Sequence, residues 1–204
     1  MEGAFVDDVQ SQEQQDYRAR TMLIHTPRLR LVTFEADYLA ALVNDPRSLG
    51  ALFKVAIPDQ WPALPSAYAL ALSRLREQPS LSLSGWWLYL FISPSLKSVV
   101  GSGGFRSDPD ADGVVEIGCE IAPVFRRQGF GSEAVRGLAG YAFTRPAVTA
   151  IEAHSLPAKG PQSGLTRAVG MSRIGEATDS VAGKIWRWQI SRAAFEQSVR
   201  GART

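Results

Sequence analysis

Short segments in which polar and apolar residues alternate recur along the chain. From Arg28 to Phe34 the alternation predicts a half-buried strand. Further runs rich in β-branched and aromatic residues also predict strands. They cover residues 86–92, 98–105, 114–121, 148–154 and 184–190, and one more strand precedes the last of these.

Apolar residues three or four positions apart predict the helices. The clearest stripe predicts a helix from Ser132 to Phe143. Its members are Ala134, Val135, Leu138, Ala139 and Ala142. Weaker stripes predict helices at 35–44, 66–76, 161–169 and 192–199, the last with Ser191 as its N-cap. Three prolines predict an irregular segment from Gly50 to Pro65.

The order of these elements predicts the fold class. A strand and two helices precede three strands whose short connections favour antiparallel hairpins, and a helix, a strand, a helix and two strands follow. We therefore expect an α+β (mixed α/β) domain over residues 22–204, with one central, mostly antiparallel, twisted sheet of about seven strands flanked by helices. Residues 1–21 are rich in Gln, Ser and Glu and predict a flexible N-terminal extension, with a short docked helix as the alternative.

Composition argues against several classes of protein. The 204 residues carry a net charge of +2 and no Lys/Arg block longer than two, which argues against a nucleic-acid partner. No apolar run reaches membrane-spanning length and the N-terminus lacks the apolar core of a signal peptide. A single cysteine, Cys119, excludes an internal disulfide and fits a reducing cytoplasm. We expect a cytoplasmic protein without a metal site.

The turn between the strand at 114–121 and the helix after it carries the most chemical information. Arg126, Gly129 and Gly131 form the pattern R-x-x-G-x-G, which aims backbone N–H groups and a helix N-terminus at one spot and suits a pyrophosphate. Gly129, Gly131 and Ala134 also satisfy the dinucleotide pattern G-x-G-x-x-A. Seven residues separate the strand from the first glycine, which argues against that alternative. An ordinary strand-to-helix loop is the other alternative.

With the strand end Ile-Ala-Pro before it, this turn resembles the acetyl-coenzyme A motif of the GNAT acetyltransferases. Further similarity is to the branch that contains the ribosomal-protein N-terminal (alanine/serine) acetyltransferases, and it covers roughly residues 22–192. The segments that carry it are Thr26-Pro-Arg-Leu-Arg-Leu, Val100-Gly-Ser-Gly-Gly-Phe, Glu116-Ile-Gly, Gly131-Ser-Glu-Ala, Leu156-Pro and Ala168-Val-Gly-Met.

The resemblance implies an N-acetyltransferase that uses acetyl-coenzyme A as co-substrate. The acceptor would be a primary amine, on a small molecule or a protein N-terminus, that attacks directly within a ternary complex. The turn would hold the pyrophosphate, and the strand end would pair with the pantetheine arm. The residues implied in this binding are Cys119, Ile121, Arg126, Arg127, Gln128, Gly129, Phe130, Gly131, Ser132 and Lys159.

The strand at 114–121 also carries the candidate catalytic groups. Glu116 occupies the acidic position of Glu-Ile-Gly and is a candidate base for the amine, with a solvated or salt-bridged strand residue as the alternative. Glu120, on the same face, is a second candidate. Regular alternation places Cys119 and Ile121 on the opposite face, unless Gly118 marks a bulge. An N–H near Cys119 or Glu120 is the candidate donor to the thioester carbonyl.

Other side chains have a structural and a functional interpretation. A small buried cysteine is a better account of Cys119 than a nucleophile, because its neighbours are apolar. His154 ends a strand near the expected cleft, where it is either a titrating group or a satisfied structural histidine. Trp186 and Trp188 share one strand face, which favours the core or a homodimer contact over substrate stacking.

The chain departs from the family pattern at three positions. Lys159 and Gln162 stand where many relatives carry Asn and Ser or Ala, and Thr166 stands where many carry a tyrosine that acts as general acid. The alternative function is therefore a non-catalytic acyl-coenzyme A sensor or interaction module. The sequence carries no readable motif for the acceptor.

Overall fold

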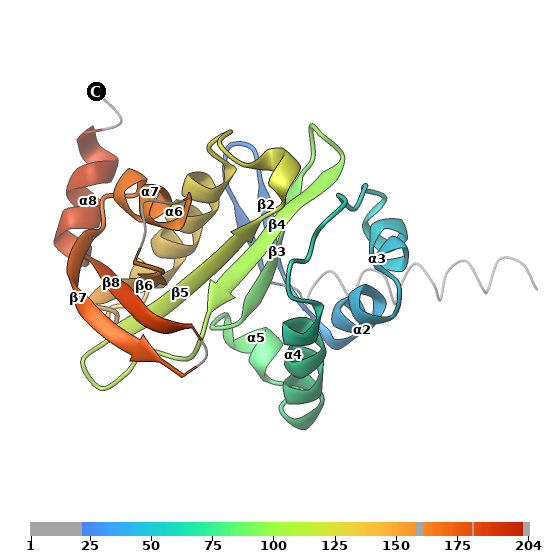
Figure 1. Ribbon diagram of the computed structural model, residues 1–204, viewed down its shortest axis with the longest axis horizontal. Coiled ribbons are helices and arrows are strands. Elements are labelled where there is room, and N and C mark those ends of the chain that lie inside the picture. Colours follow the sequence, from blue (N-terminus) through green and yellow to red (C-terminus); the bar gives the residue numbers. More distant parts are fainter. Residues whose placement is uncertain (1–21, 158–160, 181, 202–204) are drawn as a thin grey trace, which may run out of the picture.

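The computed structural model describes residues 22–157, 161–180 and 182–201, and only the backbone of 161–163. Eight strands form one sheet between two groups of helices (Figure 1). The strands are β1 (Leu23–His25), β2 (Arg30–Thr33), β3 (Leu88–Ser93), β4 (Ser98–Phe105), β5 (Val114–Ile121), β6 (Ala150–Ser155), β7 (Ser172–Asp179) and β8 (Gly183–Ser191). The helices are α2 (Ala36–Asn44), α3 (Pro46–Phe53), α4 (Pro65–Glu77), α5 (Leu81–Ser84), η1 (Pro123–Phe125), α6 (Phe130–Phe143), α7 (Pro161–Ala168) and α8 (Arg192–Gly201).

The sheet has the order β1-β2-β3-β4-β5-β6-β8-β7. Every neighbouring pair is antiparallel except β5 and β6, which are parallel. This confirms the mixed α/β fold with a mostly antiparallel sheet. The strand that the sequence did not predict is β1, a three-residue segment in which Leu23 pairs with Val32 of β2.

The parallel pair β5–β6 separates partway along its length. Its register runs from Val114↔Ala150 to Ile117↔Ala153 and ends there. Beyond that point β5 continues to Ile121 alongside β4 alone, and β6 continues to Ser155 alongside β8. The two central strands therefore open into a wedge.

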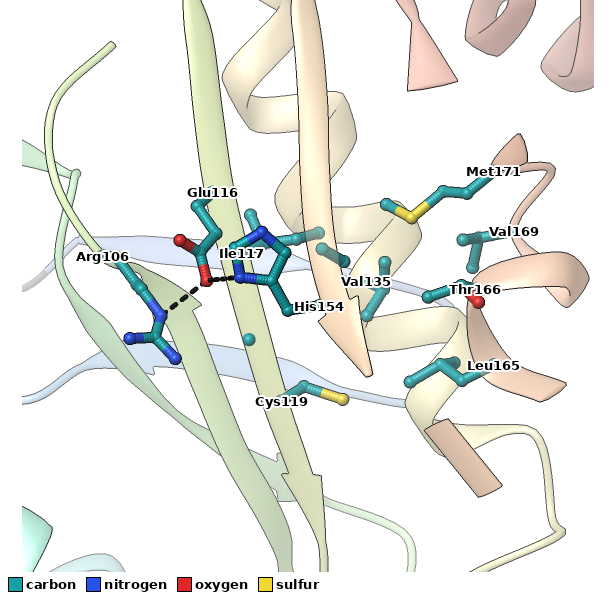
Figure 2. A pocket seen from close by; sticks show the side chains of 12 residues that line it. Arg106, Glu116, Ile117, Cys119, Val135, His154, Leu165, Thr166, Val169 and Met171 are labelled. Carbon is teal, nitrogen blue, oxygen red and sulfur yellow. Dashed lines mark ion pairs between the residues drawn. The ribbon is translucent and has the colours of Figure 1, made fainter. Parts of the chain in front are cut away.

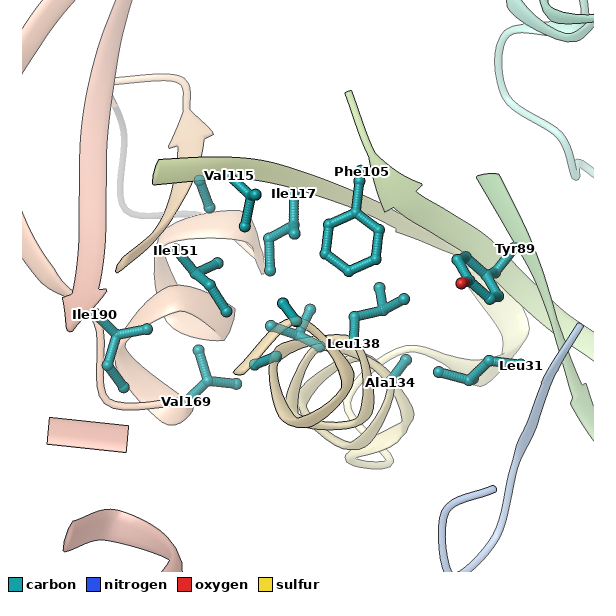
Figure 3. Close-up of a cluster of buried hydrophobic side chains, with 14 of the residues drawn as sticks. Leu31, Tyr89, Phe105, Val115, Ile117, Ala134, Leu138, Ile151, Val169 and Ile190 are labelled. Carbon is teal, nitrogen blue, oxygen red and sulfur yellow. The ribbon is translucent and has the colours of Figure 1, made fainter. Parts of the chain in front are cut away.

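Two apolar clusters hold the helices onto opposite faces of the sheet. The larger is centred on α6, with Leu138 fully buried against Val115, Ile117 and Ile151 of the two central strands (Figure 3). Helices α7 and α8 extend the same layer. The apolar stripe predicted for the 132–143 helix is the buried face of α6, which begins two residues earlier, at Phe130.

The second cluster packs α2, α3 and α4 against the other face of β2, β3 and β4. Trp61 and Trp87 lie in this cluster, and Tyr89, Phe91 and Phe105 lie in the first one. Trp188 is also buried in the first cluster. These aromatic side chains are therefore core residues.

Helix α3 corrects the prediction that Gly50 to Pro65 is irregular throughout. The Asp45 carboxylate accepts a hydrogen bond from the Arg47 N–H at 3.0 Å, and Pro46 occupies the first helical position. Asp-Pro therefore ends α2 and also starts α3, because Asp is a good N-cap and proline tolerates the first turn.

Strand β5 is regular at Gly118. Its pairing with β4 runs without a register shift from Gly101↔Ile121 to Phe105↔Ile117, so along the described ladder Gly118 does not form the bulge considered above. Side chains of β5 therefore alternate strictly between the two faces. Among the described helices, none is both long and apolar enough to cross a membrane.

Candidate active site

A cavity of about 250 Å³ lies where β5 and β6 separate (Figure 2). Its polar side chains are Arg106, Glu116, His154 and Thr166. Its apolar wall comes mainly from α6 and from the segment around α7, through Val135, Leu165, Val169 and Met171. The cavity therefore joins the α6 side of the sheet to the face that carries Glu116.

The free edge of β5 lines this opening. The Ala122 N–H donates to the Val100 carbonyl and the Arg106 N–H donates to the Glu116 carbonyl, both at 3.0 Å. In an antiparallel ladder such pairs recur at every second residue, so the even-numbered residues of β5 face β4. The N–H groups of Cys119 and Ile121 consequently point toward the wedge. Of the two candidate carbonyl donors, the register favours Cys119 over Glu120.

The glycine turn adds a second group of N–H donors. Gly129 has a φ of 82° and precedes α6, and Arg127 has a φ of 59°. The first helical bond of α6 runs from the Glu133 N–H to the Gly129 carbonyl. For the N–H groups of residues 127–132, the described part of the chain supplies no hydrogen-bond acceptor. Unpaired N–H groups at a helix N-terminus form an anion site.

The connection between β1 and β2 holds this turn in place. The Glu133 carboxylate accepts hydrogen bonds from the Thr26 hydroxyl and the Arg28 N–H, both at 2.6 Å, and from Arg28 Nε at 2.6 Å. Arg28 Nη1 donates to the Gln128 carbonyl, and its guanidinium lies 4.4 Å from the centre of the Phe130 ring. Partial burial raises the pKa of Glu133, but the bonds from Thr26 and Arg28 outweigh burial and lower it.

The residues implied in cofactor binding occupy different environments. Arg126, Arg127 and Gln128 are exposed at the turn, whereas the Phe130 side chain is buried, so only its backbone faces the turn. Arg126 Nε donates to the Ile121 carbonyl at 2.9 Å. Gly131 is closely packed, because a Cβ there would lie 3.3 Å from Ile121 Cγ1, and Ser132 is half-buried.

Glu116 and His154 meet at the mouth of the cavity (Figure 2). His154 Nδ1 lies 3.0 Å from Glu116 Oε1, and Arg106 Nε lies 2.7 Å from the same oxygen. Both side chains of the Glu116–His154 pair are about three-quarters buried, with 25% and 24% exposed. The predicted base is therefore salt-bridged and also faces the cavity.

Glu120 lies on the same face of β5 as Glu116 but makes different contacts. Its Oε1 accepts the Ala63 N–H at 2.7 Å, which ties the segment before α4 to β5. The Tyr68 hydroxyl shares a hydrogen bond with the Ser102 hydroxyl nearby, and burial raises the Tyr68 pKa. Glu120 does not line the cavity and is placed to hold a loop.

Cys119 faces the α6 side, as its alternation predicts, and its side chain lines the cavity. Burial, with a smaller contribution from the Glu120 charge, raises the pKa of the thiol to about 12. The thiol is therefore protonated near neutral pH and a poor nucleophile.

Of the three residues that depart from the family pattern, only Thr166 has a described side chain. Thr166 is buried and lines the cavity at the position of the family tyrosine. Lys159 lies outside the described residues, and for Gln162 only the backbone is described. The role of Lys159 therefore stays a prediction.

Two residues near the site were missed by the sequence analysis: Arg106 and Arg187. The hairpin register pairs Phe105 with Ile117, so the next pair is Arg106 with Glu116, and the predicted hairpin contained this signal. Arg187 binds Glu152, the neighbour of Glu116 across the parallel ladder. That contact requires β8 to lie beside β6, and no pattern of residues within either strand predicts this pairing. Within the described residues, no three His, Cys, Asp or Glu side chains are grouped as metal ligands.

The model of the acetyltransferase (GNAT) domain matches residues 28–172. An uncharacterised N-acetyltransferase of Bacillus subtilis (strain 168), YjdG, is 29% identical over 133 residues, which cover 65% of this chain and 79% of that protein.

Solved structures with the same fold include ribosomal-protein acetyltransferases. A putative ribosomal-protein-serine acetyltransferase from Vibrio cholerae has a TM-score of 0.62 at 19% identity, covering 83% of this chain and 97% of that chain. RimL, a ribosomal L7/L12 α-N-protein acetyltransferase in complex with coenzyme A, has a TM-score of 0.64 at 15% identity, covering 85% of this chain and 99% of that chain.

Proposed function

Because this chain belongs to the acetyltransferase (GNAT) family, we propose that it transfers an acetyl group from acetyl-coenzyme A to a primary amine by direct attack in a ternary complex. The observation that carries the proposal is the wedge between β5 and β6, toward which the N–H groups of Cys119 and Ile121 point and which has an ionisable cluster at its mouth. The N-acetyltransferase relatives support acetyl transfer as the reaction class.

The residues present fit the co-substrate. The unpaired N–H groups of residues 127–132 suit the pyrophosphate, and the exposed Arg126 and Arg127 add positive charge beside them. The N–H groups of Cys119 and Ile121 suit an extended pantetheine arm that adds to the free edge of β5. Arg126 would then exchange its bond to the Ile121 carbonyl for a phosphate contact.

Glu116 is the proposed acceptor of the amine's proton, and the Cys119 N–H is the proposed donor to the developing oxyanion. Direct attack is favoured over an acyl-enzyme because the Cys119 thiol is protonated near neutral pH. The proposed acceptor class is an amine on a small molecule or a protein N-terminus, and the similarity to RimL, a ribosomal L7/L12 α-N-protein acetyltransferase, supports the second of these.

Thermal unfolding with and without acetyl-coenzyme A tests the binding step. At a concentration of about 100 Kd the co-substrate should stabilise the fold by about 2.7 kcal/mol, whereas free adenine should do little. Gly129→Pro removes one N–H and forbids the φ of 82°, so it should abolish the shift. Gly183→Pro alters another glycine of positive φ outside the turn and should keep the shift.

Release of free thiol across a panel of small amines and peptides tests turnover. The acetyltransferase proposal expects release above background with at least one amine. Binding of acetyl-coenzyme A without release on any acceptor would instead support the non-catalytic sensor. Thr166, at the position of the family's general acid, is the observation that keeps this second candidate.

A further inference from the structure

Five charged side chains form a continuous chain beside the cavity. Arg106 and His154 both contact Glu116, and His154 also contacts Glu152 through Nε2 at 2.8 Å. Arg187 binds Glu152 with two hydrogen bonds, from Nε at 2.5 Å and Nη2 at 2.8 Å. The chain therefore spans the end of β4 and the strands β5, β6 and β8.

The two contacts of His154 require more protons than a neutral imidazole has. Nδ1 and Nε2 each face a carboxylate oxygen at hydrogen-bond distance. A neutral ring carries one N–H, so with both carboxylates ionised it leaves one lone pair facing a negative oxygen. One additional proton, on the ring or on a carboxyl, satisfies both contacts.

Glu152 determines which nitrogen keeps its proton. The hydrogen bonds from Arg187 are the main cause that lowers the pKa of Glu152, so this carboxylate stays ionised. An ionised Glu152 at 2.8 Å holds the hydrogen on Nε2, because a charged acceptor forms the stronger bond. The nitrogen that can gain or lose a proton is then Nδ1, which faces Glu116.

We propose that Glu116 and His154 act as one proton-accepting pair, in which Glu116 contacts the amine and His154 receives the proton from it. The inference rests on the acetyltransferase function proposed above. The ammonium N–H bond breaks as a Glu116 O–H bond forms. That proton then moves to Nδ1, which restores the Glu116 carboxylate and leaves His154 as imidazolium. Bulk water takes the proton from the partly exposed ring.

Arg106 and His154 face the same oxygen of Glu116. Arg106 Nε lies 2.7 Å from Oε1, and His154 Nδ1 lies 3.0 Å from it. A proton accepted by this carboxylate is therefore next to a ring nitrogen that can receive it. Glu152 contacts the other ring nitrogen and is held by Arg187, and Cys119 and Thr166 line the same cavity as His154.

A purely structural clamp is the rival interpretation, since the same contacts join β5, β6 and β8 at the wedge. The two interpretations differ in pH dependence. The working form of the pair has Glu116 ionised and His154 neutral, so the rate should fall in acid, where the pair carries an additional proton. A clamp changes stability and leaves the shape of the pH profile unchanged.

His154→Asn tests the pair kinetically, with His25→Asn as the matched control in exposed β1. We measure kcat from about pH 5 to about pH 9, with acetyl-coenzyme A binding followed separately. His154→Asn should lose about 10²-fold in kcat and lose the acidic limb, with binding kept. His25→Asn should match the wild type. An unchanged profile in His154→Asn overturns the pair even if wild-type turnover is confirmed.

A measurement without turnover separates this inference from the proposed function. Only His25 and His154 carry imidazoles in the chain, so ¹⁵N shifts of the ring nitrogens in wild type and His25→Asn identify His154. The neutral ring should carry its hydrogen on Nε2, and Glu116→Gln should shift the His154 titration. A hydrogen on Nδ1, or a titration unaffected by Glu116→Gln, overturns the pair whether or not the protein turns over.

Discussion

At the scale of single residues, two carboxylates on one strand face have separate environments. Glu116 faces the cavity together with His154, whereas Glu120 holds the Ala63 N–H. Their spacing of four residues placed both on one face from sequence alone. Their different contacts come from neighbours that are distant in the sequence. The alternation of β5 alone therefore could not distinguish the two environments.

Substitution of the two carboxylates should have different kinetic effects. Glu116→Gln should lower kcat by about 10²-fold or more and keep acetyl-coenzyme A binding, because it removes a proton acceptor. Glu120→Ala should instead raise the acceptor KM, because the Ala63 loop loses its anchor, and Glu120→Gln should restore it, because the amide oxygen still accepts. Steady-state kinetics of the three variants check this. Equal loss of kcat in Glu120→Gln would contradict the assignment.

The Cys119 thiol should react slowly despite lining the cavity. With a pKa of about 12, roughly one thiol in 10⁵ is ionised at pH 7, because burial disfavours the thiolate. Iodoacetamide alkylation of the native protein should therefore accelerate about tenfold per pH unit between about pH 7 and pH 10. The urea-unfolded chain should level off near the ordinary thiol pKa of about 8.5. Levelling off at that pH in the native protein would contradict the burial argument.

At the scale of elements, Glu133 connects the segment between β1 and β2 to the glycine turn before α6. It sits in the first turn of α6, where a carboxylate is favoured by the helix dipole, and it binds Thr26 and Arg28. The family motif flagged both segments separately. Their contact joins residues more than a hundred positions apart, and no local periodicity indicates it.

Glu133→Gln should destabilise the fold in a pH-dependent way. The folded pKa of Glu133 is lowered, so its stabilisation is full above the unfolded pKa of about 4.3 and is lost as the pH falls through the lower folded value. We expect a loss of about 1–2 kcal/mol in the free energy of unfolding at pH 7. The difference from wild type should shrink in urea titrations below about pH 4. A constant difference down to pH 3 would show that ionisation is not the cause.

The secondary structure was predicted best where buried and exposed residues recur at regular intervals along the element. The sequence predicted the bounds of β4 and β5 correctly, because their alternation and their turn residues agree. It missed α3, because Asp45-Pro46 was interpreted only as a helix end. It also missed β1 and α5, which are too short to show any period.

At the scale of the whole molecule, the wedge depends on strand order. The parallel contact of β5 with β6, and the place where it ends, positions Glu116, His154 and the free edge of β5 together. The sequence predicted every strand except β1 and placed the glycine turn before α6. It did not give the β6-β8 pairing that brings Arg187 to Glu152.

Hydrogen exchange should report occupation of the wedge as a local effect. Acetyl-coenzyme A should slow exchange by about tenfold or more in peptides that cover residues 118–133, because their free N–H groups gain acceptors. Peptides from α2 and α3, on the other side of the sheet, should change little. Mass spectrometry of the two states checks this. Uniform protection across the chain would indicate global stabilisation in place of strand addition.

The strict alternation of β5 has a consequence for how the chain can change in length. A one-residue deletion at Ile117 or Gly118 would exchange the two faces and the two edges for every residue beyond it. Cys119 would turn to the Glu120 side, and the N–H groups meant for the wedge would turn to β4. Insertions and deletions are therefore compatible with this site only outside β5, as in the loop 106–113 that precedes the strand.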